Sequence, residues 1–125
     1  MKVLVVDDET DIKMLFQQRF RKEIKHGDFN FLFATSGEEA LGILGENFHE
    51  AILILSDINM PGMSGLQLLE KIRQAYEKPP PIVMMITAYG DDDNYKQAMQ
   101  LGANDFLTKP LDFTLLKEKL KMIPH

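Results

Sequence analysis

The sequence predicts an α/β fold, in which a doubly wound parallel sheet of five strands is covered by helices on both faces. Short apolar runs alternate along the chain with amphipathic stretches of helical spacing, and this alternation is typical of such sheets. Three of the runs are apolar throughout, as expected of strands that are buried on both faces. The chain has 125 residues, a length that suits one domain covering residues 1–125.

Strands and helices are expected to alternate five times. The expected strands are residues 3–6, 29–33, 51–55, 82–86 and 105–109. The first helix carries a set of apolar residues at helical spacing: Ile12, Leu15, Phe16, Phe20 and Ile24. Gly27 is expected to end this helix. The second helix begins near Ser36 and Glu39, which have the spacing of a capping box.

The remaining three helices follow the third, fourth and fifth strands. The third covers residues 64–76 and carries Leu66, Leu69 and Ile72 on one face. The fourth covers residues 91–101, with acids that favour a helix start, and is expected to end at Gly102. Asp112 is expected to cap the fifth and Pro124 to end it, and three of its residues are expected to face inward: Leu115, Leu116 and Leu120.

The composition excludes several classes of function. The chain contains no cysteine, so disulfides and thiolate metal sites are excluded and a reducing, cytoplasmic location is expected. The net charge of -5 makes direct binding to nucleic acid or to an anionic membrane unfavourable. The apolar run at the start is too short for a signal peptide, and no apolar stretch approaches the roughly 20 residues of a membrane span.

The residues at the ends of the strands carry the candidate chemistry. In doubly wound sheets, ligands bind at the carboxyl ends of the strands. This sequence places there Asp7, Asp8 and Glu9 at the first strand, Asp57 at the third, Thr87 and Ala88 at the fourth, and Lys109 at the fifth. Carboxylates, a hydroxyl and an ammonium group are therefore expected to converge at one edge of the sheet.

Converging carboxylates repel one another, by about 1 kcal/mol for a pair at about 4 Å in water and by about 4 kcal/mol at an effective dielectric constant of about 20. One lysine does not offset three acids, but a divalent cation with oxygen ligands does, and Mg2+ is the usual ion beside phosphate. Lys109 and the hydroxyl of Thr87 then remain for phosphate oxygens. The arrangement predicts phosphoryl transfer to Asp57, which is ionised because a free aspartate has a pKa of about 3.9. The small loop after Asp57 is expected to leave room for metal and phosphate.

Four stretches at these strand ends resemble a known family: VLVVDDE, LSDINMPGMSG, MMITAYG and FLTKPLD. In this order they are similar to the receiver (response regulator) domain of two-component signalling, the CheY-like family, over nearly the whole chain. The resemblance implies a flavodoxin-like sheet with strand order 2-1-3-4-5 and five helices. It also implies a signalling switch rather than an enzyme, one that promotes only its own phosphorylation and dephosphorylation.

The resemblance implies a role for each residue of the predicted site. Asp57 matches the phosphoacceptor. Asp7 and Asp8 match the acidic pair that holds Mg2+, together with Asp57 and the backbone carbonyl of Asn59. Lys109 matches the phosphate-binding lysine, whose bond to the following proline is cis in that family.

A second group of residues matches the switch of the family. Thr87 matches the hydroxyl that moves towards the phosphate, and Ala88 matches a small residue whose backbone N–H reaches it. Phe106 matches the aromatic residue that turns inward when Thr87 moves. Asn59 and Tyr89 fall where the family tunes dephosphorylation.

The resemblance also implies partners. The expected phosphoryl donor is a phosphohistidine on a sensor histidine kinase or on a histidine phosphotransfer protein. The signal is expected to pass to an output domain or partner protein, or to a phosphorylation-dependent homodimer, through the fourth helix, fifth strand and fifth helix. This face includes Tyr95, Gln97, Phe106 and parts of residues 112–122. The identity of the output stays open.

Several alternatives remain open at this point. Asp7 and Asp8 could cap the first helix, and the domain could be an interaction module that works without phosphorylation. A phosphatase that forms an aspartyl phosphate would need Asp-x-Asp after the first strand, where this chain has Asp7, Asp8 and Glu9. A flavodoxin-type nucleotide binder would need a phosphate loop rich in glycine, serine and threonine at the same place.

Overall fold

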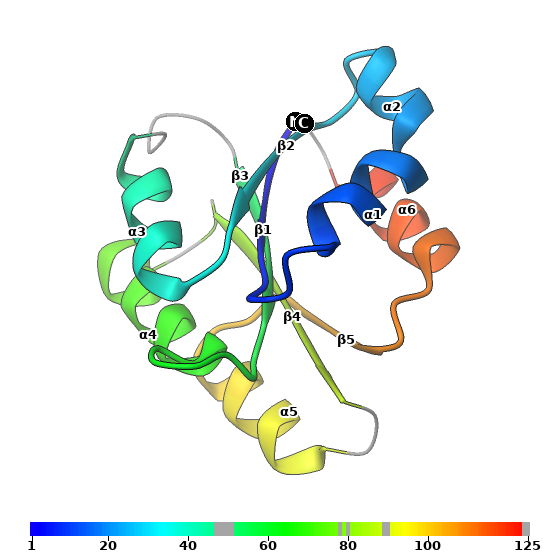
Figure 1. The fold of residues 1–125 in the computed structure, drawn as a ribbon. Helices are drawn as coiled ribbons and strands as arrows, with labels where there is room; N and C mark the ends of the chain where they lie inside the picture. The colour runs from blue at the N-terminus through cyan, green and yellow to red at the C-terminus, as the bar shows by residue number, and fades with distance from the viewer. Residues whose placement is uncertain (47–51, 78, 80, 89–90, 124–125) are drawn as a thin grey trace.

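The computed structural model describes residues 1–46, 52–77, 79, 81–88 and 91–123, and five parallel strands form one sheet within them (Figure 1). The strands are β1 (Lys2–Val6), β2 (Asn30–Ala34), β3 (Ile52–Asp57), β4 (Ile82–Ala88) and β5 (Asp105–Lys109). Their order in the sheet is β2-β1-β3-β4-β5, which confirms the predicted fold class and strand order. Ala51, with which the third strand was expected to begin, lies outside the described residues.

Helices cover both faces of this sheet. They are α1 (Ile12–Arg19), α2 (Arg21–Lys25), α3 (Gly37–Glu46), α4 (Gly65–Ala75), α5 (Asp92–Gln100) and α6 (Phe113–Lys121). Figure 1 shows α1 and α6 on one face and α3, α4 and α5 on the other. None of the helices in the described ranges is long and apolar enough to cross a membrane.

Each face of the sheet has its own apolar core. The core under α1 and α6 includes Phe16, Phe20, Leu116 and Leu120, and the core under the other three helices includes Ala40, Leu68, Ile72 and Ala98. Val3 and Val5 of β1 belong to the first core, whereas Leu4 and Val6 belong to the second. Successive strand residues point to opposite faces, so a strand buried on both faces has to be apolar throughout, as predicted.

The prediction of one helix from Ile12 to Ile24 is wrong, because the backbone leaves helical geometry at Phe20 (φ -106°, ψ 21°) and α2 begins after it. The ring of Phe20 stays in the core, with its centroid 5.7 Å from that of Phe16. The short helix that follows contributes no buried residue, and Ile24 is 37% exposed. The described chain therefore has one helix more than predicted, and Leu15 is exposed as well.

Gly27 and Gly102 end their helices as predicted. Both have positive φ, 77° and 100° respectively, the left-handed conformation that favours glycine. After Gly102 the chain closes a Schellman motif, in which the N–H of Ala103 donates to the carbonyl oxygen of Ala98 at 3.0 Å. Equivalent bonds follow Gly27, so both helices stop where the sequence places a residue that tolerates this turn.

The predicted cap at Asp112 is present, and of the predicted capping box the Ser36 bond is present, whereas the Glu39 carboxylate accepts from Thr35 Oγ1. Ser36 Oγ accepts a hydrogen bond from the N–H of Glu39 at 3.1 Å at the start of α3. Asp112 Oδ1 accepts from the N–H of Thr114 at 3.0 Å at the start of α6. These side chains satisfy backbone donors that have no partner within the first turn of a helix.

One apolar position of α6 differs from the prediction. Leu116 and Leu120, four residues apart, are fully buried, whereas Leu115 is 44% exposed. The prediction that Leu115 faces inward is wrong, because adjacent residues of a helix do not share a face. Pro124, the predicted end of this helix, lies outside the described residues.

Candidate functional site

Three aspartates gather at the carboxyl ends of β1 and β3. Asp57 is the last residue of β3, and Asp7 follows the last residue of β1. The two strands are neighbours in register, with Val6 beside Ser56, so the two aspartates come together. Carboxylate oxygens of Asp7, Asp8 and Asp57 lie within 4.8 Å of one another. Asp57 is 3% exposed and Asp7 is 5% exposed, whereas Asp8 faces solvent.

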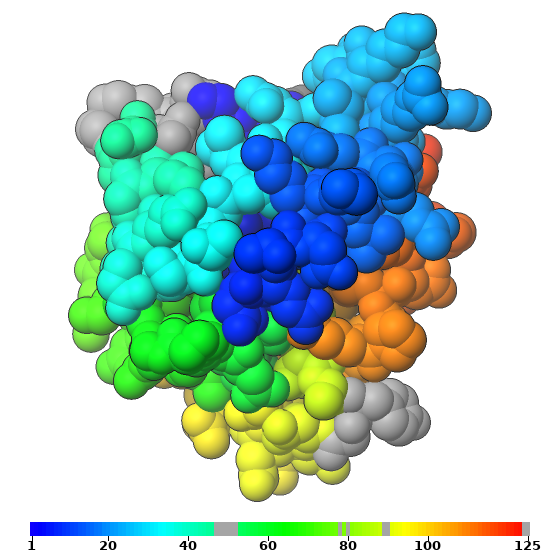
Figure 2. All heavy atoms as spheres, in the orientation of Figure 1, coloured from blue at the N-terminus to red at the C-terminus, as the bar shows by residue number. Residues whose placement is uncertain are grey.

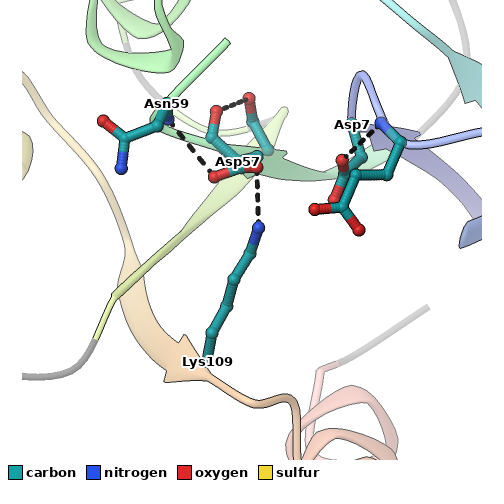
Figure 3. Close-up of polar contacts among 6 residues, drawn as sticks. Asp7, Asp57, Asn59 and Lys109 are labelled. Atoms are coloured by element: carbon teal, nitrogen blue, oxygen red, sulfur yellow. Dashed lines mark hydrogen bonds and ion pairs between the residues drawn. The ribbon is translucent and has the colours of Figure 1, made fainter.

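Among the described residues, the carboxylate of Asp57 has two polar partners at the edge of the sheet (Figure 3). The Nζ atom of Lys109, at the end of β5, lies 2.8 Å from its Oδ2 atom. The backbone N–H of Asn59 donates to its Oδ1 atom at 3.2 Å. The side chain of Lys109 thus reaches from β5 past the intervening β4 to the carboxylate of β3. The bond between Lys109 and Pro110 is cis, as the sequence resemblance implies.

Asp7 holds the turn that follows β1. Its Oδ1 atom accepts a hydrogen bond from the N–H of Glu9 at 2.9 Å (Figure 3). The N-cap position of α1 belongs to Asp11, which makes no side-chain cap bond. Neither Asp7 nor Asp8 caps the first helix, so that alternative is wrong and both carboxylates remain at the site.

The electrostatics of the cluster show that it is short of positive charge. Burial raises the pKa of Asp7, and the charge of Asp57 raises it further, although the hydrogen bond from Glu9 lowers it. Partial burial lowers the pKa of Lys109, but its hydrogen bond to Asp57 and the surrounding acids outweigh this effect and raise the net pKa. Lys109 therefore stays charged, and Asp7 resists ionisation next to a second carboxylate.

The raised pKa of Asp7 predicts a pH dependence of stability in metal-free protein. The folded state binds the proton of Asp7 more tightly than the unfolded chain, where the pKa is 3.8. The stability from this group is therefore complete below about pH 3.8 and is lost as pH rises through the higher folded-state pKa. Urea denaturation in EDTA should show that Asp7→Asn becomes more stable relative to wild type over this range. A relative stability that does not change with pH would contradict the expected shift.

Thr87 and Ala88 form the end of β4, the strand between Asp57 and Lys109. Thr87 is 0% exposed, and its Oγ1 atom has no hydrogen-bond partner among the described residues. An unpaired buried hydroxyl costs about 1–3 kcal/mol, so a polar ligand beside Thr87 would satisfy it. Ala88 is exposed, whereas Tyr89 lies outside the described residues.

Phe106 lies on β5, three residues before Lys109. Its ring is half-buried and packs edge-on against Tyr95 of α5, with 5.1 Å between the ring centroids. It also contacts the core under α3, α4 and α5. The structure therefore places Phe106 among apolar side chains, while Tyr95 on its outer side is 47% exposed.

Gly65 and Ser56 support Asp57 in a way that the sequence reasoning missed. The N–H of Gly65, the first residue of α4, donates to the carbonyl oxygen of Ile58 at 2.8 Å. A Cβ atom at Gly65 would overlap the carbonyl oxygen of Asp57 and lie 2.7 Å from Cα of Ile58. Ser56 Oγ donates to that same carbonyl of Asp57 at 3.0 Å. This glycine therefore serves close packing of α4 on the aspartate's backbone, whereas the sequence reasoning assigned the small loop residues to the space for metal and phosphate.

The donor set fits a hard divalent cation. Three carboxylates offer oxygen atoms within 4.8 Å of one another, and Asn59 lies next to them in an exposed turn. Oxygen ligands of this kind suit Mg2+ or Ca2+ rather than softer metals. The cluster is thus an acidic metal site by its chemistry, as the sequence predicted.

Comparisons with known proteins agree with this geometry. A family model described as "Response regulator receiver domain" matches residues 3–121. The chemotaxis protein CheY homolog of Campylobacter jejuni is 36% identical over 123 residues, which cover 97% of this chain and 90% of that protein. Other curated relatives are longer, and the chain spans 30% to 50% of the length of three of them.

Two solved structures carry the same fold. A response regulator receiver domain protein from Clostridium thermocellum superposes with a TM-score of 0.83 at 30% identity, over 96% of this chain and 90% of that one. The receiver domain of the yeast response regulator Ssk1 (Saccharomyces cerevisiae), crystallised with the histidine phosphotransfer protein Ypd1, gives a TM-score of 0.83 at 26% identity, over 97% and 86% of the two chains. With its sheet order, its acidic cluster and a family match over nearly its whole length, this chain belongs to the response regulator receiver domain family.

Proposed function

We propose that this protein is a phosphoryl-accepting signalling switch in which Asp57 takes a phosphoryl group from a phosphohistidine. One observation carries the proposal. A nearly buried carboxylate stands 2.8 Å from the ammonium group of Lys109 and within a cluster of two further carboxylates. Such a group is a fixed carboxylate nucleophile with a cation beside it, and it needs no general base.

The transfer would exchange one bond for another. An oxygen of Asp57 attacks phosphorus and forms the O–P bond, while the P–N bond breaks and its electron pair stays on the imidazole nitrogen. Lys109 would move its ammonium group from Asp57 to a phosphoryl oxygen. Mg2+, held by Asp7, Asp8, Asp57 and the backbone carbonyl of Asn59, would supply positive charge to the phosphoryl oxygens when bound.

The remaining predicted residues would convert this event into a change of shape. The hydroxyl of Thr87 has no partner in the described structure, which supports a role as donor to a phosphoryl oxygen. The backbone N–H of Ala88 would donate to another. Movement of Thr87 would leave space for the side chain of Phe106 to turn inward. The ring of Phe106 would then lose its contact with the exposed ring of Tyr95.

The donor would approach through a cavity of about 580 Å3 beside the site. Asp7 and Lys109 line it on the polar side, and Leu15, Ala88 and Phe113 are among its apolar residues. A sensor histidine kinase or a histidine phosphotransfer protein would therefore pack against these apolar residues while its phosphohistidine approaches Asp57. The relative of known structure that was crystallised with a histidine phosphotransfer protein supports this class of partner.

The signal would leave through the face of α5, β5 and α6, to an output domain, a partner protein or a second copy of the chain. Tyr95 and Met99 of α5 and Leu115 of α6 are apolar and exposed, at 47%, 40% and 44%, which supports docking there. The proposal treats residues 1–125 as one receiver domain that works in the cytoplasm. It catalyses no reaction beyond gain and loss of its own phosphoryl group.

The proposal predicts that acetyl phosphate and Mg2+ add one phosphoryl group to the protein. Intact-mass spectrometry should detect the adduct, and a sample with EDTA should lack it because the carboxylates would then hold no cation. If beryllofluoride with Mg2+ also shifts the NMR signals of Thr87 and Phe106, the switch is supported. A folded, Mg2+-binding protein that gives neither result would instead be an interaction module that works without phosphorylation.

A further inference from the structure

Positive charge is concentrated in one segment of this acidic chain. Residues 12–27 contain one carboxylate, that of Glu23, and five cations: Lys13, Arg19, Arg21, Lys22 and Lys25. The segment therefore carries +4, and since the whole chain carries -5, the remainder carries -9. The carboxylate of Glu23 is already engaged, because its Oε1 atom lies 3.4 Å from Nζ of Lys117 on α6.

Two of these cations border a cavity of about 400 Å3, here called the β2-edge groove. Its lining consists of two amides, of the cations Arg21 and Lys25, and of the apolar side chains of Ile24, Phe31 and Phe33. Both cations are exposed. Within the described part of the chain, neither forms an ion pair or a hydrogen bond. The groove thus has an unneutralised basic rim.

The floor of the β2-edge groove is a packed aromatic cluster. The ring centroid of Phe31 lies 4.9 Å from that of Phe20, 5.5 Å from that of Phe16 and 6.3 Å from that of Phe33. Phe31 and Phe33 are nevertheless only half-buried. Ile24, which also lines the groove, is 37% exposed on α2, a helix that projects at the upper right of the molecule in Figure 2. The groove is therefore a preformed recess for an apolar side chain.

The strand beside the groove has a free edge. Among the described residues, β2 is the outermost strand of the sheet, and β1 is the one strand that pairs with it. The backbone N–H and C=O groups on the outer side of such a strand can pair with an added extended peptide. The groove runs along β2 from Asn30 to Phe33. Asp57 is not among its lining residues and lies on β3, on the far side of β1, so a ligand here would leave the phosphoryl site open.

We propose that the β2-edge groove binds an extended acidic segment of a partner protein. One aromatic or large aliphatic side chain of that segment would sit against Phe31 and Phe33, and flanking carboxylates would pair with Arg21 and Lys25. A peptide fits better than a bilayer, because the apolar surface lies in a groove beside the cations. It fits better than nucleic acid, because the chain as a whole carries a net charge of -5.

The test uses a fluorescein-labelled peptide of sequence Glu-Asp-Phe-Asp-Glu and measures fluorescence anisotropy. Wild type should bind it, and the charge-reversed variant Arg21→Glu/Lys25→Glu should bind at least about tenfold more weakly. The control Lys96→Glu/Lys121→Glu has the same net charge as the Arg21→Glu/Lys25→Glu variant, but it alters exposed lysines on α5 and α6, outside the groove. It should therefore bind the peptide like wild type. NMR signals of Asn30, Phe31 and Phe33 should shift in wild type during the titration, which locates binding without any variant.

Three outcomes would overturn the proposal. The first is no binding of the peptide by wild type up to about 1 mM. The second is an equal loss in both charge-reversed variants, since that would reflect net charge rather than the groove. The third is binding of phosphatidylserine vesicles or of duplex RNA, but not of the peptide, that depends on Arg21 and Lys25, because the occupant would then be a different macromolecule.

Discussion

Replacing Lys109 by methionine should slow phosphorylation of the protein by acetyl phosphate about 100- to 1000-fold while Mg2+ still binds. Among the described residues, Lys109 is the cation in contact with Asp57. In the proposed transfer its ammonium group would follow the charge that develops on the phosphoryl oxygens. Methionine has a similar length and fills similar space, but it carries no charge and donates no hydrogen bond.

The same variant should respond more strongly to Mg2+ in thermal unfolding. Without Lys109, the nearly buried carboxylate of Asp57 has lost its ion-pair partner, so the metal-free protein contains uncompensated negative charge. A bound divalent cation offsets that charge, and the rise in Tm on adding Mg2+ should exceed the rise for wild type. This readout separates a lost transfer step from a lost fold.

Lys119→Met is a matched control for the lysine variant. Lys119 makes an ion pair of 2.7 Å with Asp105, and its side chain is 29% exposed, against 35% for Lys109. Its partner is Asp105 and not Asp57, so its removal should leave the phosphorylation rate unchanged within about twofold. The cost in stability should be about 1 kcal/mol or less, because the ion pair is partly exposed. Equal rates for Lys109→Met and wild type would show that the ammonium group has no part in the transfer.

Gly65→Ala should destabilise the protein by about 2–3 kcal/mol or more and weaken Mg2+ binding as well. The added methyl group would overlap the carbonyl oxygen of Asp57 and the Cα atom of Ile58. These are backbone atoms at the end of a central strand, so they cannot move aside as a flexible side chain can. Either α4 or the end of β3 has to shift, and the shift would displace the carboxylate of Asp57.

Gly42→Ala provides the control for this substitution. Gly42 lies within α3 and is exposed, and apart from its chain neighbours and the adjacent backbone of its own helix, no atom lies within 4 Å of the place where a Cβ atom would stand. Alanine there should stabilise the protein by about 0.5–1 kcal/mol, because glycine is the poorer helix former. Urea denaturation measures both variants. If Gly65→Ala were as stable as wild type and bound Mg2+ equally well, close packing would not be the reason for this glycine.

Much of the fold could be predicted because local signals and the apolar pattern agree. The uninterrupted apolar runs gave central strands that are buried on both faces, and Gly27 and Gly102 end helices in the conformation that glycine favours. The break at Phe20 could not be predicted, since helical spacing continues through Ile24. At this position the ring of Phe20 packs against Phe31 of β2, a contact between distant parts of the sequence that helical spacing does not reveal.

The candidate site, like the fold, could be predicted from the sequence only in part. The rule that ligands bind at the carboxyl ends of parallel strands predicts from the sequence alone that Asp7, Asp57 and Lys109 lie close together. Two features of the site were not predicted: the unpaired hydroxyl of Thr87 and the contact of Gly65 with the backbone of Asp57. Both depend on how atoms from separate segments of the chain pack together. The GMSG segment could have signalled the second feature, because a glycine at the start of a helix often marks close approach of another chain segment.

Locating the phosphoryl group within the chain tests the central claim most directly. After reaction with acetyl phosphate and Mg2+, sodium borohydride reduces an acyl phosphate to an alcohol, so a phosphorylated aspartate becomes homoserine. Tandem mass spectrometry of the digested protein then identifies the modified position. The account predicts homoserine in place of Asp57, and none in the Asp57→Asn protein treated in the same way. Homoserine in place of Asp7 or Asp8, with none in place of Asp57, would contradict it.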